Sequence, residues 1–182
     1  LSREDHLPLS IAQQRLWFLS QLEPVSTAYN IAQVYQLMGP LNITALEQSL
    51  KGIVQRHEIL RTTFSMMNGE PVQVIAPSLT STLSVIDLCV LPVSEKEEEV
   101  QRVIDQERRW RFDLTHGPLL RATLLRLDQT EHVLCVVIHH IITDGWSMGI
   151  FFHELSALYD AFSAGKAPSL PELPIQYADF AV

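Results

Sequence analysis

The sequence predicts a mixed α/β fold, an α+β two-layer sandwich in which helices cover mainly one face of a mixed sheet. Helical and strand patterns interleave along the chain, so helices should pack against a sheet that contains hairpins. Asn68-Gly69 separates two apolar runs, a pattern typical of a β-hairpin. The run from Val133 to Ile138 is apolar at every position, as in a strand that is buried on both faces.

Capping residues and turn signals divide the first half of the chain into two helices and three strands. Ser10 can cap a helix that Pro24 ends, and Asn42 or Thr44 opens a second helix with apolar residues at helical spacing. The predicted strands cover residues 29–37, 61–67 and 71–75.

The second half continues the alternation of strands and helices. A short strand is expected over residues 83–86, and Ser94 with Glu97 has the pattern of a capping box at the start of a third helix. A turn at residues 128–131 leads into the central apolar strand. A fourth helix starts near Trp146 and ends at Gly165, and the proline-rich residues 165–175 form an extended connector.

Composition bounds the class of protein. The chain has 182 residues, 47% of them hydrophobic, which is enough for one well-buried core. Its net charge of −8 predicts no nucleic-acid partner and no anionic membrane partner. Cys89 and Cys135 are too few for a disulfide framework, no apolar run reaches the length of a membrane span, and residues 1–6 lack the apolar core of a signal peptide. We therefore expect a cytoplasmic protein.

The turn from the central strand into the fourth helix carries the residues best suited to chemistry. It holds His139, His140, Asp144 and Gly145. Successive strand side chains point to opposite faces, so only one of the two histidines can face a given channel. Asp144 can accept backbone hydrogen bonds at the helix start or pair with an arginine. Gly145 allows a positive φ or a close backbone approach.

Two other interpretations of this turn follow from the residues alone. In the first, a capping aspartate, a turn glycine and two hydrogen-bonded histidines serve only the sheet edge. In the second, His139, His140, Asp144 and His153 bind a metal ion, but adjacent strand histidines diverge and no Cys or His cluster completes the site. We therefore expect no metal.

Residues 138–147 resemble the HH-x-x-x-D-G signature of condensation domains of nonribosomal peptide synthetases. Residues 9–19, 56–64 and 177–182 resemble the first, second and fourth motifs of that family, in the same order. Thr143 stands where the family more often has Ser, and Phe180 where it often has Tyr. The resemblance implies that residues 1–182 form the N-terminal lobe of such a domain, with a chloramphenicol acetyltransferase-like fold and without the second lobe.

The resemblance also implies a reaction and its partners. The α-amine of an acceptor aminoacyl thioester attacks the carbonyl of a donor acyl or peptidyl thioester and forms an amide. Both substrates are carried on phosphopantetheine arms, so this lobe itself should bind no cofactor. The expected partners are the second lobe, the donor and acceptor peptidyl carrier proteins, and an adjacent adenylation domain. Alone, the lobe is expected to be inactive.

Each residue of the turn receives an expected role from the resemblance. His140 is the catalytic residue, with His139, Asp144, Gly145 and Arg61 in support. The backbone N–H of Gly145 can contact an oxyanion, and Arg61 is the candidate partner of Asp144, with Arg15 or an arginine of the second lobe as alternatives. Arg15, Trp146 and Ser147 are candidates for the channel lining.

Two rival functions stay open at this point. An epimerisation domain shares the signature, whereas a heterocyclisation domain carries aspartates in place of His139 and His140. Residues 144–149 and the first motif are more similar to condensation domains, particularly those that join two L-residues. The other rival is a non-catalytic module that docks a carrier or partner protein.

Overall fold

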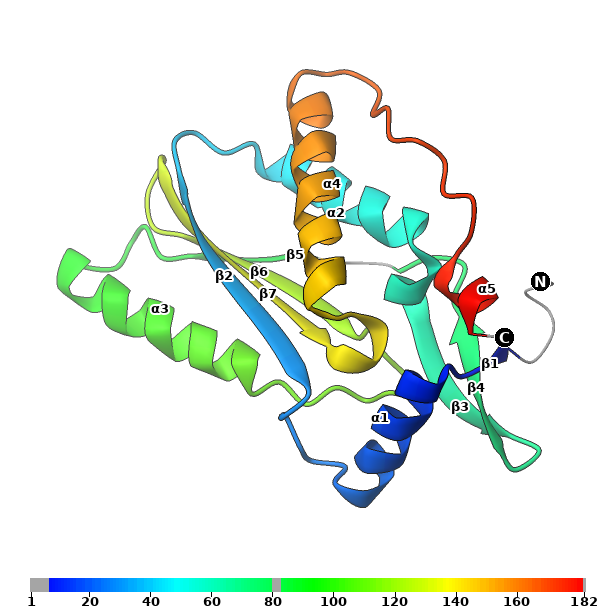
Figure 1. Cartoon of the computed structure of the whole chain (residues 1–182). Coiled ribbons are helices and arrows are strands. Elements are labelled where there is room, and N and C mark those ends of the chain that lie inside the picture. Colours follow the sequence, from blue (N-terminus) through cyan, green and yellow to red (C-terminus); the bar gives the residue numbers. More distant parts are fainter. Residues whose placement is uncertain (1–6, 80–82, 182) are drawn as a thin grey trace.

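The computed structural model describes residues 7–79 and 83–181 and has a four-stranded mixed sheet at its centre (Figure 1). The strand order is β2-β7-β6-β5, with β5 and β6 parallel and the other neighbours antiparallel. The strands are β2 (Asn30–Met38), β5 (Leu83–Asp87), β6 (Leu120–Arg126) and β7 (Glu131–His139). The strand that ends at His139, β7, therefore lies between two neighbours and not at the sheet edge, and His140 is the first residue of the turn that follows it.

A second, antiparallel sheet has the strand order β1-β4-β3. It contains β1 (Leu7–Pro8), β3 (Thr62–Met67) and β4 (Glu70–Ile75). The predicted hairpin is confirmed, because Asn68 and Gly69 join β3 to β4 with φ values of 54° and 86°. Sequence patterns alone did not show that these strands form a sheet of their own.

Five α-helices are described, and the two predicted from Ser10 and Asn42 begin where these caps indicate. They are α1 (Ile11–Leu22), α2 (Ile43–Arg56), α3 (Val93–Arg108), α4 (Gly145–Ser163) and the short α5 (Tyr177–Phe180), with 3₁₀ turns η1 (Glu58–Arg61) and η2 (His140–Ile142). Ser10 forms a capping box with Gln13, and Asn42 caps α2. The predicted capping box at Ser94 is absent, because α3 begins earlier, with Pro92 at its N-cap.

Side-chain alternation along β6 and β7 explains how helices cover both faces of the sheet. Leu134, Val136 and Ile138 of β7 belong to the large core that includes α2 and α4. Val133 of β7 and Leu125 of β6 point the opposite way and pack against α3. The mixed α/β class is confirmed, but α3 adds a third layer to the predicted two-layer sandwich, as Figure 1 shows.

A segment without helix or strand joins α4 to α5, where the sequence predicts the connector. It brings Tyr177 back to the start of α1, where the Tyr177 hydroxyl lies 2.9 Å from Ser10 Oγ. In Figure 1 it descends beside the end of α2 to α5. In the described part of the chain, no helix is long and apolar enough to cross a membrane, and Cys89 and Cys135 are both free.

Candidate active site at the end of β7

The signature turn begins at the end of β7, where hydrogen bonds from both sides fix its backbone. His139 N–H donates to the Leu119 carbonyl (3.0 Å), and His140 N–H donates to the Tyr29 carbonyl (2.8 Å). One turn of 3₁₀ helix, η2, then leads to α4. The apolar residues of η2, Ile141 and Ile142, are buried. The sheet therefore holds the two histidines on a rigid backbone.

His139 is the buried histidine of the pair, with 6% of its surface exposed. Its Nδ1 accepts a hydrogen bond from Ile141 N–H (3.1 Å). The ring centroids of Tyr29 and Phe112 lie 6.4 and 6.2 Å from the centroid of its imidazole ring. Burial, with a smaller contribution from the nearby His140, lowers the pKa of His139 to about 4. At neutral pH His139 is therefore an uncharged acceptor inside the turn.

His140 is exposed and lines a pocket. Its Nδ1 lies 2.6 Å from the carbonyl oxygen of Thr143. Because a carbonyl can only accept, Nδ1 carries the hydrogen in the neutral ring, and Nε2 has the free lone pair. The 3₁₀ turn thus selects the tautomer in which Nε2 can take a proton.

Asp144 is the N-cap of α4. Its Oδ1 accepts a hydrogen bond from Ser147 N–H (2.7 Å). Hydrogen bonds from Ser147 are the main cause that lowers the pKa of this carboxyl below its usual value. Asp144 is therefore ionised at neutral pH, at the positive end of the helix dipole.

The expected pair between Arg61 and Asp144 is not formed. Arg61 Nη2 lies 3.8 Å from Glu58 Oε1, and Arg61 Nη1 donates to the Ala76 carbonyl. Within residues 7–79 and 83–181, no ion pair joins Arg61 to Asp144. The guanidinium faces its own 3₁₀ turn and the end of β4, whereas the Asp144 carboxylate turns back onto α4.

The backbone conformation at Gly145 does not require a glycine. Its φ is not among the positive φ values of the described glycines, and a Cβ at this position would meet no atom within 4 Å. The expectation of a positive φ is therefore wrong, and that of a close approach by this chain's own backbone is too. The glycine instead leaves open space at the first residue of α4.

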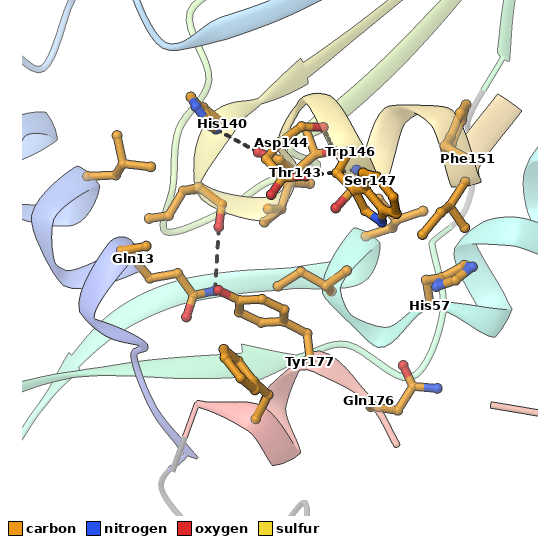
Figure 2. Close-up of a pocket in the computed structure, with 18 of the residues that line it drawn as sticks. Gln13, His57, His140, Thr143, Asp144, Trp146, Ser147, Phe151, Gln176 and Tyr177 are labelled. Atoms are coloured by element: carbon orange, nitrogen blue, oxygen red, sulfur yellow. Dashed lines mark hydrogen bonds between the residues drawn. The ribbon is translucent and has the colours of Figure 1, made fainter. Parts of the chain in front are cut away.

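A cavity of about 750 Å³ lies beside the turn and opens to the surface. Figure 2 shows His140 on one side of this pocket and His57 on the other, with Gln176 and Tyr177 below. Trp146 and Ser147 line it, as expected. Arg15 is exposed on α1 and is not a lining residue.

Outside the signature turn, four polar lining residues were missed from the sequence. They are Gln13, His57, Gln176 and Tyr177, which come from α1, the end of α2, and the connector with α5. Gln13 is buried and donates to the Ile141 carbonyl (3.4 Å), which ties α1 to the signature turn. Gln13, His57 and Tyr177 lie inside the other segments that resemble the family's motifs, and that signal could have found them.

Metal-ligating side chains do not gather in the part of the chain that the structure describes. Its residues contain no group of three or more His, Cys, Asp or Glu side chains that could hold a metal ion. His153 is exposed on α4 and is not a lining residue of the pocket.

Comparison with known proteins identifies the family. Residues 3–182 match the family described as "Condensation domain". The chain is 54% identical over 182 residues to a linear gramicidin synthase protein of Brevibacillus parabrevis, covering 100% of this chain and 4% of that protein. It is 51% identical over 180 residues to chondramide synthase cmdD of Chondromyces crocatus, and this match covers 99% of this chain and 5% of that protein. The chain thus spans only a small part of these relatives.

Solved structures agree with this match. The X-domain in its complex with OxyB from teicoplanin biosynthesis is 32% identical, with a TM-score of 0.87 over 100% of this chain and 38% of that chain. The first condensation domain of the calcium-dependent antibiotic synthetase, in complex with a substrate analogue, is 27% identical. Its TM-score is 0.83, and the match covers 93% of this chain and 40% of that chain. These neighbours confirm the predicted chloramphenicol acetyltransferase-like lobe. The chain belongs to the condensation-domain family of nonribosomal peptide synthetases.

Proposed function

We propose that the domain containing this chain forms the amide bond between two carrier-bound thioesters in nonribosomal peptide synthesis. The observation that carries the proposal is the state of His140, exposed on the pocket with Nδ1 hydrogen-bonded to Thr143 O and Nε2 free to accept a proton. A histidine held in one tautomer at the mouth of a cavity is suited to proton transfer.

The proposed reaction forms one bond and breaks another. The acceptor amine attacks the donor carbonyl, so a C–N bond forms, and collapse of the tetrahedral intermediate breaks the C–S bond. A free α-amine has a pKa of about 8, so a useful fraction is already neutral near pH 7. His140 Nε2 receives the amine proton or orients the amine, and the proton passes to the departing thiolate.

The supporting residues act through the turn. Asp144 caps α4 and His139 accepts from Ile141 N–H, so both hold the backbone on either side of His140. Gly145 N–H belongs to the first turn of α4, where backbone N–H groups have no intrahelical acceptor. We assign this N–H to the developing oxyanion, a role that the open space at Gly145 supports.

The same proposal defines the partners. The phosphopantetheine arms belong to donor and acceptor carrier proteins, and an adjacent adenylation domain supplies the activated amino acid. The second lobe completes the channel. Two free thiols fit a reducing cytoplasm.

The test is peptide-bond formation followed by mass spectrometry. The complete parent domain receives loaded donor and acceptor carriers, and wild type is compared with His140→Ala. Product should be lost in the variant while carrier binding is retained. Unchanged product would show that the signature is structural here and that positioning in the channel carries the reaction.

Two alternatives are separated by the same assay. An epimerisation domain would invert the α-carbon of a donor residue without joining two substrates, which chiral analysis of the released amino acids detects. The teicoplanin X-domain, which is solved in complex with OxyB, supports a docking role as the second alternative. If the domain is a docking module, its wild-type and His140→Ala forms would bind the partner equally well, and neither would form an amide.

We further propose that residues 1–182 alone do not condense. Large apolar side chains are exposed around the pocket, with exposed fractions of 82% for Trp146, 63% for Ile175 and 70% for Phe180. An uncovered apolar rim of this kind favours self-association. Size-exclusion chromatography over a concentration series should show a shift towards larger species, and a strictly monomeric profile at all concentrations would count against this proposal.

A further inference from the structure

Glu154 is a buried acid on α4 that the proposed reaction does not use. Only 8% of its surface is exposed. Its carboxylate lies 3.2 Å from Arg56 Nε and 2.6 Å from His57 Nε2. Both partners stand at the C-terminal end of α2. A buried carboxylate is tolerated when cations and hydrogen bonds compensate it, so this contact locks α4 to the end of α2.

The end of α2 in turn holds the connector. Arg56 Nη2 donates to the Pro171 carbonyl (2.5 Å), and Gln176 Nε2 donates to the Arg56 carbonyl (3.0 Å). Gln176 Oε1 also accepts from Glu58 N–H (3.1 Å). The segment between these anchors is otherwise extended and lacks strand or helix hydrogen bonds. Its position therefore depends on the Arg56 side chain at Pro171 and on the backbone at the end of α2 at Gln176.

This anchored segment forms one wall of the pocket. We name Leu173, Ile175, Gln176 and Tyr177 the connector wall, because all four line the cavity. Glu154 belongs to the same helix that begins at the signature turn, with Asp144 at its N-cap. One rigid helix thus connects the turn that carries His140 to the site where the connector wall is fixed. Figure 2 shows Gln176 and Tyr177 across the pocket from the signature turn.

We propose that Glu154 is a positioning residue for amide formation: by binding Arg56 and His57, it fixes the connector wall relative to His140. This inference rests on the proposed function. Glu154 does not contact the reacting atoms, and its effect passes through Arg56 to the wall. Loss of the carboxylate frees the Arg56 side chain, so the wall no longer holds substrate in one place beside Nε2.

The experiment uses the complete parent domain with its cognate loaded carriers. Glu154→Gln and Glu154→Ala are compared with wild type, with Asp160→Asn as the matched control, since Asp160 is an exposed acid on the same helix. We expect the Glu154 variants to raise the apparent KM for the acceptor at least about tenfold, because small misplacements of a reactant cost up to about a hundredfold. The control should behave as wild type.

Two further readouts separate positioning from general stability. Hydrogen exchange of peptides covering residues 171–177 should accelerate in Glu154→Ala, while peptides of β7 stay protected. The double variant Glu154→Ala/Gln176→Ala should cost about as much as the larger single change, because both residues act on one wall. The inference would be overturned if the Glu154 variants kept the wild-type KM and only lowered the fraction of active protein. It would also be overturned if the effects of Glu154→Ala and Gln176→Ala added up in the double variant.

Failure of this inference and failure of the proposed function give different results. If wild type forms no amide, or His140→Ala forms as much as wild type, the proposed function itself is wrong. If wild type is active and His140→Ala is not, yet the Glu154 variants keep the wild-type KM, only the positioning role is refuted. Should Glu154→Ala not fold, Glu154→Gln and Gln176→Ala carry the same test.

Discussion

Acidification should destabilise this protein through His139 before its carboxylates are protonated. Burial lowers the pKa of His139 from the ordinary value of 6.5 to about 4 in the folded chain. Between these values the unfolded chain binds a proton that the folded chain does not, so stability is present above pH 6.5 and is lost as pH falls towards 4. At about 1.4 kcal/mol per pKa unit, the loss between pH 7 and pH 5 is about 2 kcal/mol.

The assay is urea unfolding at pH 7, 6 and 5, for wild type and His139→Asn. The Asn side chain keeps an oxygen acceptor for Ile141 N–H, which His139 Nδ1 now accepts at 3.1 Å, but it does not titrate. The free energy of unfolding of the variant should therefore fall by about 2 kcal/mol less than that of wild type across this range.

Other titrating groups cancel in this comparison. His132 is also buried and its pKa is lowered, but it is present in both proteins. His153→Asn is the matched control, since it makes the same substitution at a histidine that is exposed on α4. Parallel pH profiles for wild type and His139→Asn would refute the claim that burial keeps His139 neutral.

Two further predictions concern the start of α4. Asp144→Ala removes the hydrogen bond from Ser147 N–H and should lower the free energy of unfolding by about 1 kcal/mol in urea titrations. Asp144→Asn keeps an oxygen acceptor and should lose less, whereas equal losses in both variants would show that the hydrogen bond does not account for the effect of the cap. Gly145→Ala should leave thermal stability unchanged or higher, because its Cβ meets no atom, yet reduce amide formation if substrate occupies that space; full activity would place the substrate elsewhere.

The sequence by itself determined most of the local elements, because capping and turn residues act on their neighbours in the chain. Ser10 and Asn42 mark the helix starts because their side chains accept the free backbone N–H groups of the first turn. Asn68-Gly69 fixes the hairpin because both residues adopt positive φ. The apolar run of β7 required burial on both faces, and the structure has it. Four ordered motifs likewise identified the family and the turn that carries His140.

Tertiary structure decided which side chains meet across long separations. The resemblance to the family suggested Arg61 as the partner of Asp144. The direction of each side chain depends on how η1 and α4 pack, and Arg61 faces Glu58 and Ala76 instead. The contact of Glu154 with His57, 97 residues apart in the chain, could not follow from local patterns either. Propensity and capping act within a few residues, whereas a pocket is assembled from segments that only the packed core brings together.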